Sequence, residues 1–383
     1  MDHISRRLVA EGHSVSYVRF DDGYLTEELA VPDGVVAYDI VVPAKRFPWH
    51  VWKQERKFGE EFRNWIGAKK PDIVHTNFCL PGNVARRIAM QTKVPGVVTT
   101  YHELFGSLNA YLKCSTRRTE RNCNRLVYIS KTVARSYGAS DFLCDTNIDL
   151  SHPKLASASK PELDRDSQNT VQDTSDSKHQ LIYNGIDVQQ IQSFGANAKP
   201  VIPQQLIAVG RLVPEKGHAL IVKALPKLAE QFPEVKLVLV GEGPQRNQLA
   251  MLAKQLGVTE QVEFRGWVPQ GEVIATMTQS HCVVLPSIHE GFGLALAEAM
   301  LTGRPIVASD IPVFREVASD SGVRYFAEND SEQLATQISG ALSDPDEQSQ
   351  QACATAQRVR ENFSSELMAE RYLKIYEQLC PKK

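Results

Sequence analysis

The stretch 286–300 constrains the fold of this chain more than any other part of the sequence. It follows a short apolar run, 282–285, that is typical of a buried strand, and it turns through Gly291 and Gly293 into a segment of strong helix formers. The sequence therefore predicts a strand, a glycine loop and a helix in direct succession. The first N–H groups of a helix have no partner within it, and together with the helix dipole they form a natural site for a phosphate group.

Two carboxylates flank this turn. Glu290 precedes it, and Glu298 follows about two helical turns into the helix. A dinucleotide-like ligand carries both phosphates, which would meet the amide groups, and ribose hydroxyls, which would meet a carboxylate. This arrangement could therefore bind a dinucleotide-like ligand.

Length and composition limit what the rest of the chain can be. A chain of 383 residues is long enough for two domains, and its net charge of −2 is close to neutral. There is no apolar run long enough to span a membrane and no apolar core of a signal peptide at the start. The seven cysteines form no C-x-x-C pair, which argues against a disulfide framework and a zinc site and favours the cytoplasm.

Short β-branched runs alternate with helical stretches along the chain, which indicates parallel sheets with both faces covered. The predicted strands are 14–20, 35–42, 73–75, 97–100, 126–130, 181–183, 206–209, 235–240, 262–264, 282–285 and 306–308. They favour an α/β fold of two doubly wound, Rossmann-like domains that face each other across a cleft, 1–197 and 198–363. A final helix, 364–383, carries an apolar stripe and begins at Ser364 or Ser365.

Two parts of the chain do not follow this alternation of strands and helices. Residues 4–12 read as a helix that ends at Gly12, yet no first strand and no glycine-rich turn precede it. The first strand of the N-terminal domain is therefore expected to be missing. The polar segment 140–179 has no apolar period and is long for a connection, so it is interpreted as a disordered surface insertion.

Further glycine turns follow the strands of the second domain. Arg211 and Lys216 lie in the loop after the strand 206–209, where a guanidinium and an ammonium group could both reach a phosphate. Gly241 and Pro244 belong to a second such turn, which is a weak signal for a dinucleotide because the G-x-G-x-x-G pattern is incomplete. Taken alone, the loop with Arg211 and Lys216 is by default an ordinary surface loop with ordinary charges.

A third turn contains Gly266, Trp267 and Val268. Its backbone could hold the edge of a base, whereas the Trp267 ring is expected to lie in the core. In the first domain, His102, Ser130 and Asn184 each lie at the end of a predicted strand or directly after it, and they are expected to face the cleft. His102 could bind a sugar hydroxyl or act as an acid or base.

A local excess of positive charge marks the first domain. Between residues 45 and 135 there are 18 Lys or Arg against 6 Asp or Glu. These charges are either solvated helix faces or a basic face for a phosphorylated partner or an anionic membrane surface. Trp49 and Trp52, close to Lys45, Arg46 and Lys53, are consistent with a lipid-linked partner.

Taken together, these motifs resemble those of the retaining glycosyltransferases of the two-Rossmann-domain (GT-B) type, glycosyltransferase family 4 or group 1. The motifs that match in order and spacing are Gly210-Arg211, Lys216-Gly217, the stretches 241–244, 266–268 and 290–293, and Glu298-Ala299. His102, Ser130 and Asn184 match more loosely. The absence of G-x-S-x-G and of a P-loop motif argues against hydrolase and P-loop activities.

The resemblance implies a role for each matching residue. Arg211 and Lys216 would bind the diphosphate of a UDP- or GDP-sugar donor, together with the backbone at Gly291, Phe292 and Gly293. Glu290 and His102 would contact the donor sugar as catalytic residues. Glu298 would bind the ribose, 266–268 would hold the base, and Ser130, Asn184, Gly241 and Pro244 would line the rest of the cleft.

The resemblance also implies the partners. The acceptor would be a saccharide or a lipid-linked saccharide, in the synthesis of polysaccharide, lipopolysaccharide or glycolipid. No metal, no separate cofactor and no nucleic acid are expected, and the protein could associate peripherally with the inner face of a membrane. Two alternatives stay open: a nucleotide-sugar-binding protein with little or no catalysis because of the missing strand, and a phosphorylase or synthase that acts on a sugar phosphate.

Overall fold

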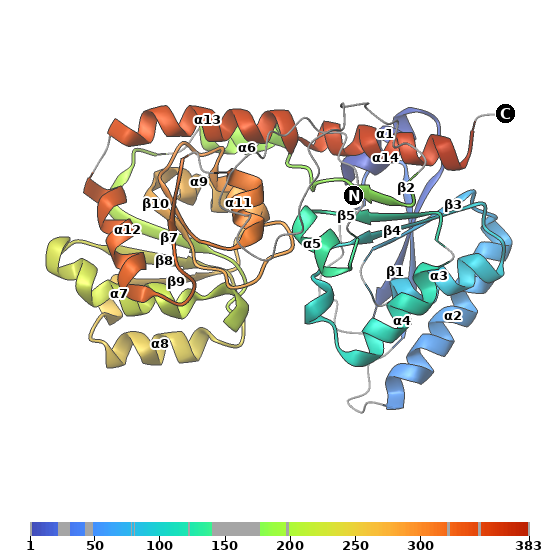
Figure 1. Ribbon diagram of the computed structural model, residues 1–383, viewed down its shortest axis with the longest axis horizontal. Coiled ribbons are helices and arrows are strands. Elements are labelled where there is room, and N and C mark those ends of the chain that lie inside the picture. Colours follow the sequence, from blue (N-terminus) through green and yellow to red (C-terminus); the bar gives the residue numbers. More distant parts are fainter. Residues whose placement is uncertain are drawn as a thin grey trace, which may run out of the picture.

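The structure, a computed structural model, describes residues 2–21, 31–42, 49–77, 79, 81–121, 123–139, 177–196, 199–319, 322–343 and 346–381. It has the predicted α/β architecture, with parallel sheets in two lobes (Figure 1). Most of the predicted insertion, residues 140–176, lies outside the described residues, as do Lys45 and Arg46. The side chains of Trp49, Trp52 and Lys53 are also outside the described part.

The second lobe is built on six parallel strands in the order β12-β11-β10-β7-β8-β9. These strands are β7 (Ile202–Val209), β8 (Lys236–Val240), β9 (Val262–Gly266), β10 (Ser280–Leu285), β11 (Ile306–Ser309) and β12 (Val323–Phe326). The chain starts in the middle with β7, moves outward to β9, and then returns to build the other half from β10. Ligands bind doubly wound sheets where the two halves meet, and this point lies between β7 and β10.

Side chains of this sheet alternate between two apolar cores, as neighbouring residues of a strand must. Leu206 and Val284 face one core, whereas Ile207 and Val283 face the other. The helices around the sheet are α6 (Val188–Ala196), α7 (His218–Gln231), α8 (Arg246–Gln255), α9 (Gln270–Gln279), α10 (Leu294–Ala299), α11 (Pro312–Ala318) and α12 (Ser331–Ser343). Helix α6 packs against α9, so the predicted boundary at residue 197 falls after a helix that belongs to the second lobe.

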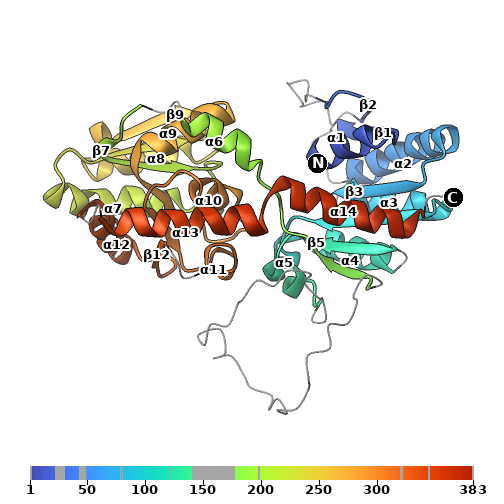
Figure 2. The ribbon, with the colours of Figure 1, turned by 90° about the horizontal axis from the view of Figure 1, so that it is seen from above.

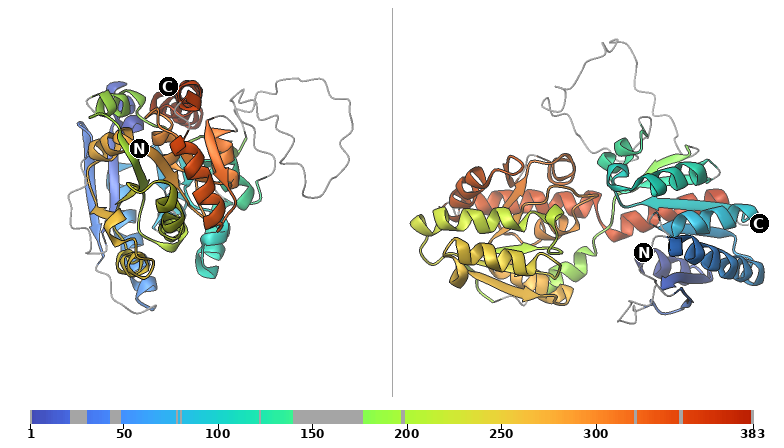
Figure 3. Two further views of the ribbon diagram at one scale, coloured as in Figure 1. Left: turned by 90° about the vertical axis from the view of Figure 1, so that its left-hand side faces the viewer. Right: turned by 90° about the horizontal axis from the view of Figure 1, so that it is seen from below.

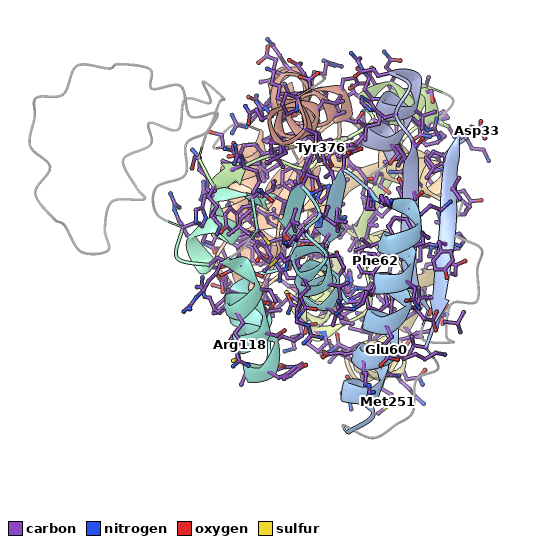
Figure 4. All side chains as sticks on the ribbon, turned by 90° about the vertical axis from the view of Figure 1, so that its right-hand side faces the viewer. Asp33, Glu60, Phe62, Arg118, Met251 and Tyr376 are labelled. Carbon is purple, nitrogen blue, oxygen red and sulfur yellow. The ribbon has the colours of Figure 1, made fainter. Side chains whose placement is uncertain are left out.

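The first lobe contains four parallel strands in the order β3-β4-β5-β6. They are β3 (Ile73–Asn77), β4 (Gly96–Tyr101), β5 (Arg125–Tyr128) and β6 (His179–Leu181). On one side lie α2 (Trp49–Lys69), α3 (Gly82–Gln91), α4 (Ala110–Glu120) and the short α5 (Lys131–Ser136); on the other lie α1 (Asp2–Ala10) and α14 (Ser365–Leu379). Figure 4 shows this layering from the end of the lobe, with Phe62 on α2 and Tyr376 on α14.

The first strands of the chain stand apart from this sheet. β1 (Val15–Asp21) and β2 (Val35–Val41) pair in parallel with each other and form a sheet of their own. Among the described strands, neither forms a ladder with β3, so the strands of this lobe fall into two sheets. Helix α1 leads directly into β1, and Gly12 beyond its end has a φ of +86°, as the sequence predicted for a C-cap glycine.

Two helices at the end of the chain lie along both lobes. α13 (Asp346–Asn362) lies along the second lobe and α14 along the first, as Figure 2 shows from above. The Ser364 hydroxyl accepts the N–H of Leu367 at 3.2 Å, so Ser364 is the N-cap of α14. The backbone of Ile186 bonds to Phe363 and Ser365, which joins the connection between the lobes to this crossing point. Seen from below, the lobes meet at one junction (Figure 3).

Candidate active site

The turn that follows β10 has the predicted form of a glycine loop leading into a helix. Gly293 has a φ of +86° and is the N-cap of α10. A Cβ at this position would lie 2.7 Å from the Phe314 ring, so both the conformation and the space favour glycine. The loop is thereby fixed at the C-terminal end of β10, beside the loop that follows β7.

The structure brings Lys216 and Glu290 together as an ion pair. Lys216 comes from the loop after β7 and Glu290 from the loop after β10, and the side chains are largely buried. The Ser287 hydroxyl donates a further hydrogen bond to Oε1 of Glu290 at 3.0 Å. One cation and one carboxylate therefore lie side by side at the point where the two halves of the sheet meet.

Backbone contacts hold these two loops in register. The N–H of Ile288 donates to the carbonyl of Glu215 at 2.8 Å. Gly217 has a φ of +67°, and a Cβ there would collide with the carbonyl oxygen of Pro286. Only a glycine allows the loops to approach this closely. These backbone contacts therefore fix the position of Lys216 next to Glu290.

Arg211 lies in the same loop and is exposed. The turn after β8 supports this loop, because the N–H of Leu212 donates to the carbonyl of Glu242 at 2.8 Å. A Cβ at Gly241 would collide with the carbonyl oxygen of Gly210. Gly241 thus serves to pack one loop on the other, whereas Pro244 in that turn is exposed.

The turn after β9 differs from the prediction at Trp267. The Trp267 side chain is 68% exposed, whereas its ring was predicted to lie in the core. Gly266 has a φ of +77° and ends β9, and Val268 packs against the core instead. Trp267, which lies between them, therefore points outward. The apolar character of its ring did not indicate this.

Glu298 lies on α10, beyond the glycine loop. The side-chain amide of Gln270 on α9 donates to its Oε1 at 2.7 Å. Burial raises the pKa of the Glu298 carboxyl above its usual range, and the hydrogen bond from Gln270 opposes this shift. Gln270 was not predicted as a site residue.

The first lobe places His102 and Ser130 against this loop. The Ser130 hydroxyl donates to the carbonyl of Gly291 at 2.7 Å. A Cβ at Gly291 would collide with the carbonyl oxygen of His102, so the backbones of the two lobes touch at this position. Residues far apart in sequence and predicted as site residues, His102, Ser130, Gly291 and the adjacent Glu290, thus meet at the junction of the lobes.

The imidazole of His102 is held by a residue that the sequence analysis did not single out. Its Nε2 lies 3.0 Å from Oδ1 of Asn77, at the end of β3. Burial lowers the pKa of His102 to about 4, so the ring is neutral near pH 7. A polar residue at the C-terminal end of a strand is the sequence signal that could have identified Asn77.

Asn184 lies in the connection between the lobes. The N–H of the neighbouring Gly185 donates to Sδ of Met368 at 3.1 Å, and a Cβ at Gly185 would lie 2.5 Å from Cα of Ser365. This segment therefore packs against the start of α14.

Two family models match the chain and together cover most of its length. The model "Glycosyltransferase Family 4" matches residues 1–142, and "Glycosyl transferases group 1" matches residues 189–360. The chain belongs to the GT-B glycosyltransferases of family 4 and group 1. The assignment to the GT-B glycosyltransferases that the motifs indicated is thereby confirmed.

Similar proteins are consistent with this assignment. A glycogen synthase of Mycobacterium tuberculosis is 28% identical over 98% of this chain and 89% of its own length. A phosphatidyl-myo-inositol mannosyltransferase of Mycobacterium leprae is 30% identical over 52% of this chain and 53% of its own.

Solved structures share the fold of the glycosyltransferase. A glycosyltransferase from Rickettsia africae superposes with a TM-score of 0.73 at 19% identity, covering 100% of this chain and 94% of that one. Anabaena Alr3699/HepE, solved with UDP-glucose, gives a TM-score of 0.65 at 17% identity over 91% of this chain and 92% of its own. In the part of the chain that the structure describes, no helix of the glycosyltransferase is long and apolar enough to cross a membrane.

Proposed function

We propose that this glycosyltransferase takes its sugar from a nucleotide-diphosphate donor and transfers it with retention of the anomeric configuration. The observation that carries the proposal is the meeting of Lys216 and Glu290 beside the backbone contact between Gly291 and His102. The Lys216–Glu290 pair of the second lobe thus lies beside the segment of the first lobe that carries His102, so a cation for the leaving diphosphate and polar groups for the donor sugar would be close together.

The chemistry of the leaving group fits the charges. Glycosyl transfer breaks the bond between sugar and diphosphate through an oxocarbenium-like transition state, and negative charge builds up on the diphosphate. Lys216 and the exposed Arg211 would stabilise that charge, together with backbone amides of the loop at Gly291, Phe292 and Gly293. Glu290, which now neutralises Lys216, would turn to the hydroxyls of the donor sugar when the diphosphate takes its place as the partner of the cation.

The remainder of the donor would lie along the second lobe. Glu298, oriented by Gln270, would accept hydrogen bonds from the ribose hydroxyls. The backbone at Gly266 and Val268 would hold the base, and the exposed ring of Trp267 is available to it. His102 would contact the donor sugar near the reacting carbon.

The similar proteins support this choice of donor. Alr3699/HepE has been solved with UDP-glucose, and another relative, from Mycolicibacterium smegmatis, is described as GDP-mannose-dependent. The acceptor would be a saccharide or a lipid-linked saccharide, in polysaccharide, lipopolysaccharide or glycolipid synthesis. The basic first lobe would favour an anionic lipid surface on the cytoplasmic side.

A second candidate is a synthase that extends a saccharide chain. It is favoured by the relative described as a glycogen synthase, which is similar along 98% of this chain. The donor chemistry is the same in both candidates. They differ in the range of acceptors, so transfer to a glucan primer and to no other acceptor would favour the second candidate.

Thermal unfolding in the presence of nucleotide sugars tests the donor. A ligand that binds only the folded state raises the melting temperature as its concentration increases. At a ligand concentration of a hundred times Kd, the free energy of unfolding rises by about 2.7 kcal/mol. We expect one UDP- or GDP-sugar to stabilise the protein in this way and to release its nucleoside diphosphate when an acceptor is added. Stabilisation without turnover by any acceptor would instead indicate a nucleotide-sugar-binding protein, and no stabilisation by any nucleotide sugar would contradict the proposal.

A further inference from the structure

We propose that Glu316 is a positioning residue that sets the spacing between the two lobes across the donor site. Glu316 lies on α11 of the second lobe, yet its carboxylate binds the first turn of α5 in the first lobe. Figures 1 and 2 both show α5 and α11 facing each other at the junction of the lobes. The inference rests on the proposed donor site, because that site is the one whose halves the contact aligns.

The carboxylate completes the cap of α5. Its Oε1 accepts the N–H of Lys131 at 2.5 Å, and its Oε2 accepts the N–H of Thr132 at 3.0 Å and the Thr132 hydroxyl at 2.9 Å. The Ser130 hydroxyl takes the next N–H, that of Val133, at 3.0 Å. First-turn N–H groups have no partner inside a helix, so two of these three depend on a residue of the other lobe.

Glu316 is fixed on its own side of the junction. It is 9% exposed, and the guanidinium of Arg358 on α13 donates to its backbone carbonyl at 3.0 Å. A second donor of Arg358 binds the carbonyl of Val317 at 2.7 Å. The end of α11 is therefore held by α13, and the carboxylate extends from a supported element rather than from a loop.

Ser130 couples this contact to the donor site. Ser130, the N-cap of α5, also donates to the carbonyl of Gly291. Gly291 adjoins Glu290 and touches the backbone of His102. If α5 moves away from α11, Ser130 moves with it, and the loop that carries Glu290 loses its fixed distance from His102.

The chemistry of the contact allows it to open. Hydrogen bonds from N–H groups to a carboxylate are stronger than neutral ones, but in the separated lobes water would solvate both the carboxylate and the amides. The net gain from closing is therefore modest, as is usual for an exchange of hydrogen-bond partners. Such a contact can favour the closed arrangement without preventing donor entry or product release.

The test compares Glu316→Gln with Glu332→Gln in the full chain. Glutamine keeps the size of the side chain but has one accepting oxygen, so one N–H of α5 loses its partner. Glu332 is an exposed carboxylate on α12, paired at the surface with Lys227, and serves as the matched control. Three quantities are measured: hydrogen exchange of α5, the Kd for UDP or GDP, and the turnover number with the nucleotide sugar.

For Glu316→Gln we expect the peptide that contains Lys131 and Thr132 to exchange about tenfold faster, with α4 unchanged. Turnover should fall about tenfold while the Kd for the nucleoside diphosphate stays within about twofold, because the nucleotide contacts lie on the second lobe. Glu332→Gln should match the unmodified protein in all three measurements. A milder variant, Thr132→Val, removes only the hydroxyl bond and should fall between the two.

Two results would overturn the inference. The first is an exchange rate of α5 that Glu316→Gln leaves unchanged, which would show that the amides do not depend on this carboxylate. The second is a loss of nucleotide binding as large as the loss of turnover, which would indicate general damage rather than positioning. If the unmodified protein turns over no nucleotide sugar, the proposed function fails, yet the exchange experiment still decides whether Glu316 holds the lobes together.

Discussion

At the scale of single residues, the site depends on a small number of charges placed by tightly packed loops. Lys216 and Glu290 neutralise each other at the ends of two adjacent strands, and Arg211 is exposed beside them. His102 contributes a neutral ring from the other lobe. None of these residues belongs to the apolar core clusters of the described part of the chain, so their roles can be measured one at a time.

Replacing Arg211 with alanine should weaken the binding of UDP or GDP by about 2 kcal/mol, the scale of a hydrogen bond to a charged group. Folding should be unaffected, because the side chain is exposed. Titration calorimetry measures the change directly. Lys254→Ala, which removes a cation at the end of α8, is the control and should bind as the unmodified protein does.

Replacing His102 with asparagine should reduce the slope of stability against pH below pH 6.5. The pKa of His102 is about 4 in the folded state and about 6.5 when unfolded. The unfolded state therefore binds more protons between these values, and stability is lost as the pH falls from about 6.5 towards 4, by up to about 1.4 kcal/mol per pH unit.

Urea denaturation across this window checks the His102 prediction. The slope should be smaller in His102→Asn and unchanged in His289→Asn, which alters an exposed histidine. Equal slopes in His102→Asn and the unmodified protein would contradict a neutral, buried His102.

At the scale of secondary-structure elements, α14 ties the end of the chain to the first lobe by buried polar contacts. The Tyr376 hydroxyl lies 2.6 Å from Nδ1 of His75 on β3, and the Tyr372 hydroxyl lies 2.8 Å from the hydroxyl of Thr100 on β4. The second nitrogen of His75 lies 2.8 Å from the same Thr100 hydroxyl. The helix is therefore fixed in register with two strands.

Replacing Tyr376 with phenylalanine should lower the free energy of unfolding by about 1–3 kcal/mol, because the buried His75 would lose one of its partners. Chemical denaturation at pH 7 measures this loss. Tyr111→Phe removes a hydroxyl that donates to Glu55 from a ring that is 51% exposed, and should cost clearly less. Similar losses in both variants would mean that burial of the hydroxyl is not what matters.

Most elements could be predicted from the sequence because their signals are local. The apolar runs of β8, β10 and β11 and the stripe of α14 need only their own residues to be recognised. β12 and α13 were not predicted: Val323–Phe326 contains an arginine within a short run, and Asp346–Asn362 has few apolar residues. Both are held in place by their neighbours rather than by their own pattern.

The site was predictable in its residue types and less so in its contacts. Glycine turns after predicted strands pointed to Lys216 and Glu290, since the C-terminal ends of parallel strands share one edge. Nothing local linked Glu316 to α5, or Asn77 to His102, because these contacts depend on how separate elements pack. Trp267 was misplaced for the same reason: burial depends on the direction in which a turn points its side chain, not on the residue type.

At the scale of the whole molecule, the two lobes have different tasks. The second lobe supplies a complete doubly wound sheet with its loops at the switch point. The first lobe supplies His102 and Ser130, and it is joined to the second lobe by the α13–α14 crossing and by the contact at Glu316. The proposed transfer requires both lobes, because the second lobe would bind the donor and the first lobe would place His102 near the donor sugar.

Release of nucleoside diphosphate by Glu290→Ala tests this account most directly. The measurement uses the donor identified by thermal unfolding and a panel of saccharide and lipid-linked acceptors, with Glu332→Ala as the control. The account predicts that turnover falls at least about a hundredfold in Glu290→Ala, with only a modest loss of stability, and is unchanged in Glu332→Ala. Turnover in Glu290→Ala equal to that of the unmodified protein would contradict the proposed site.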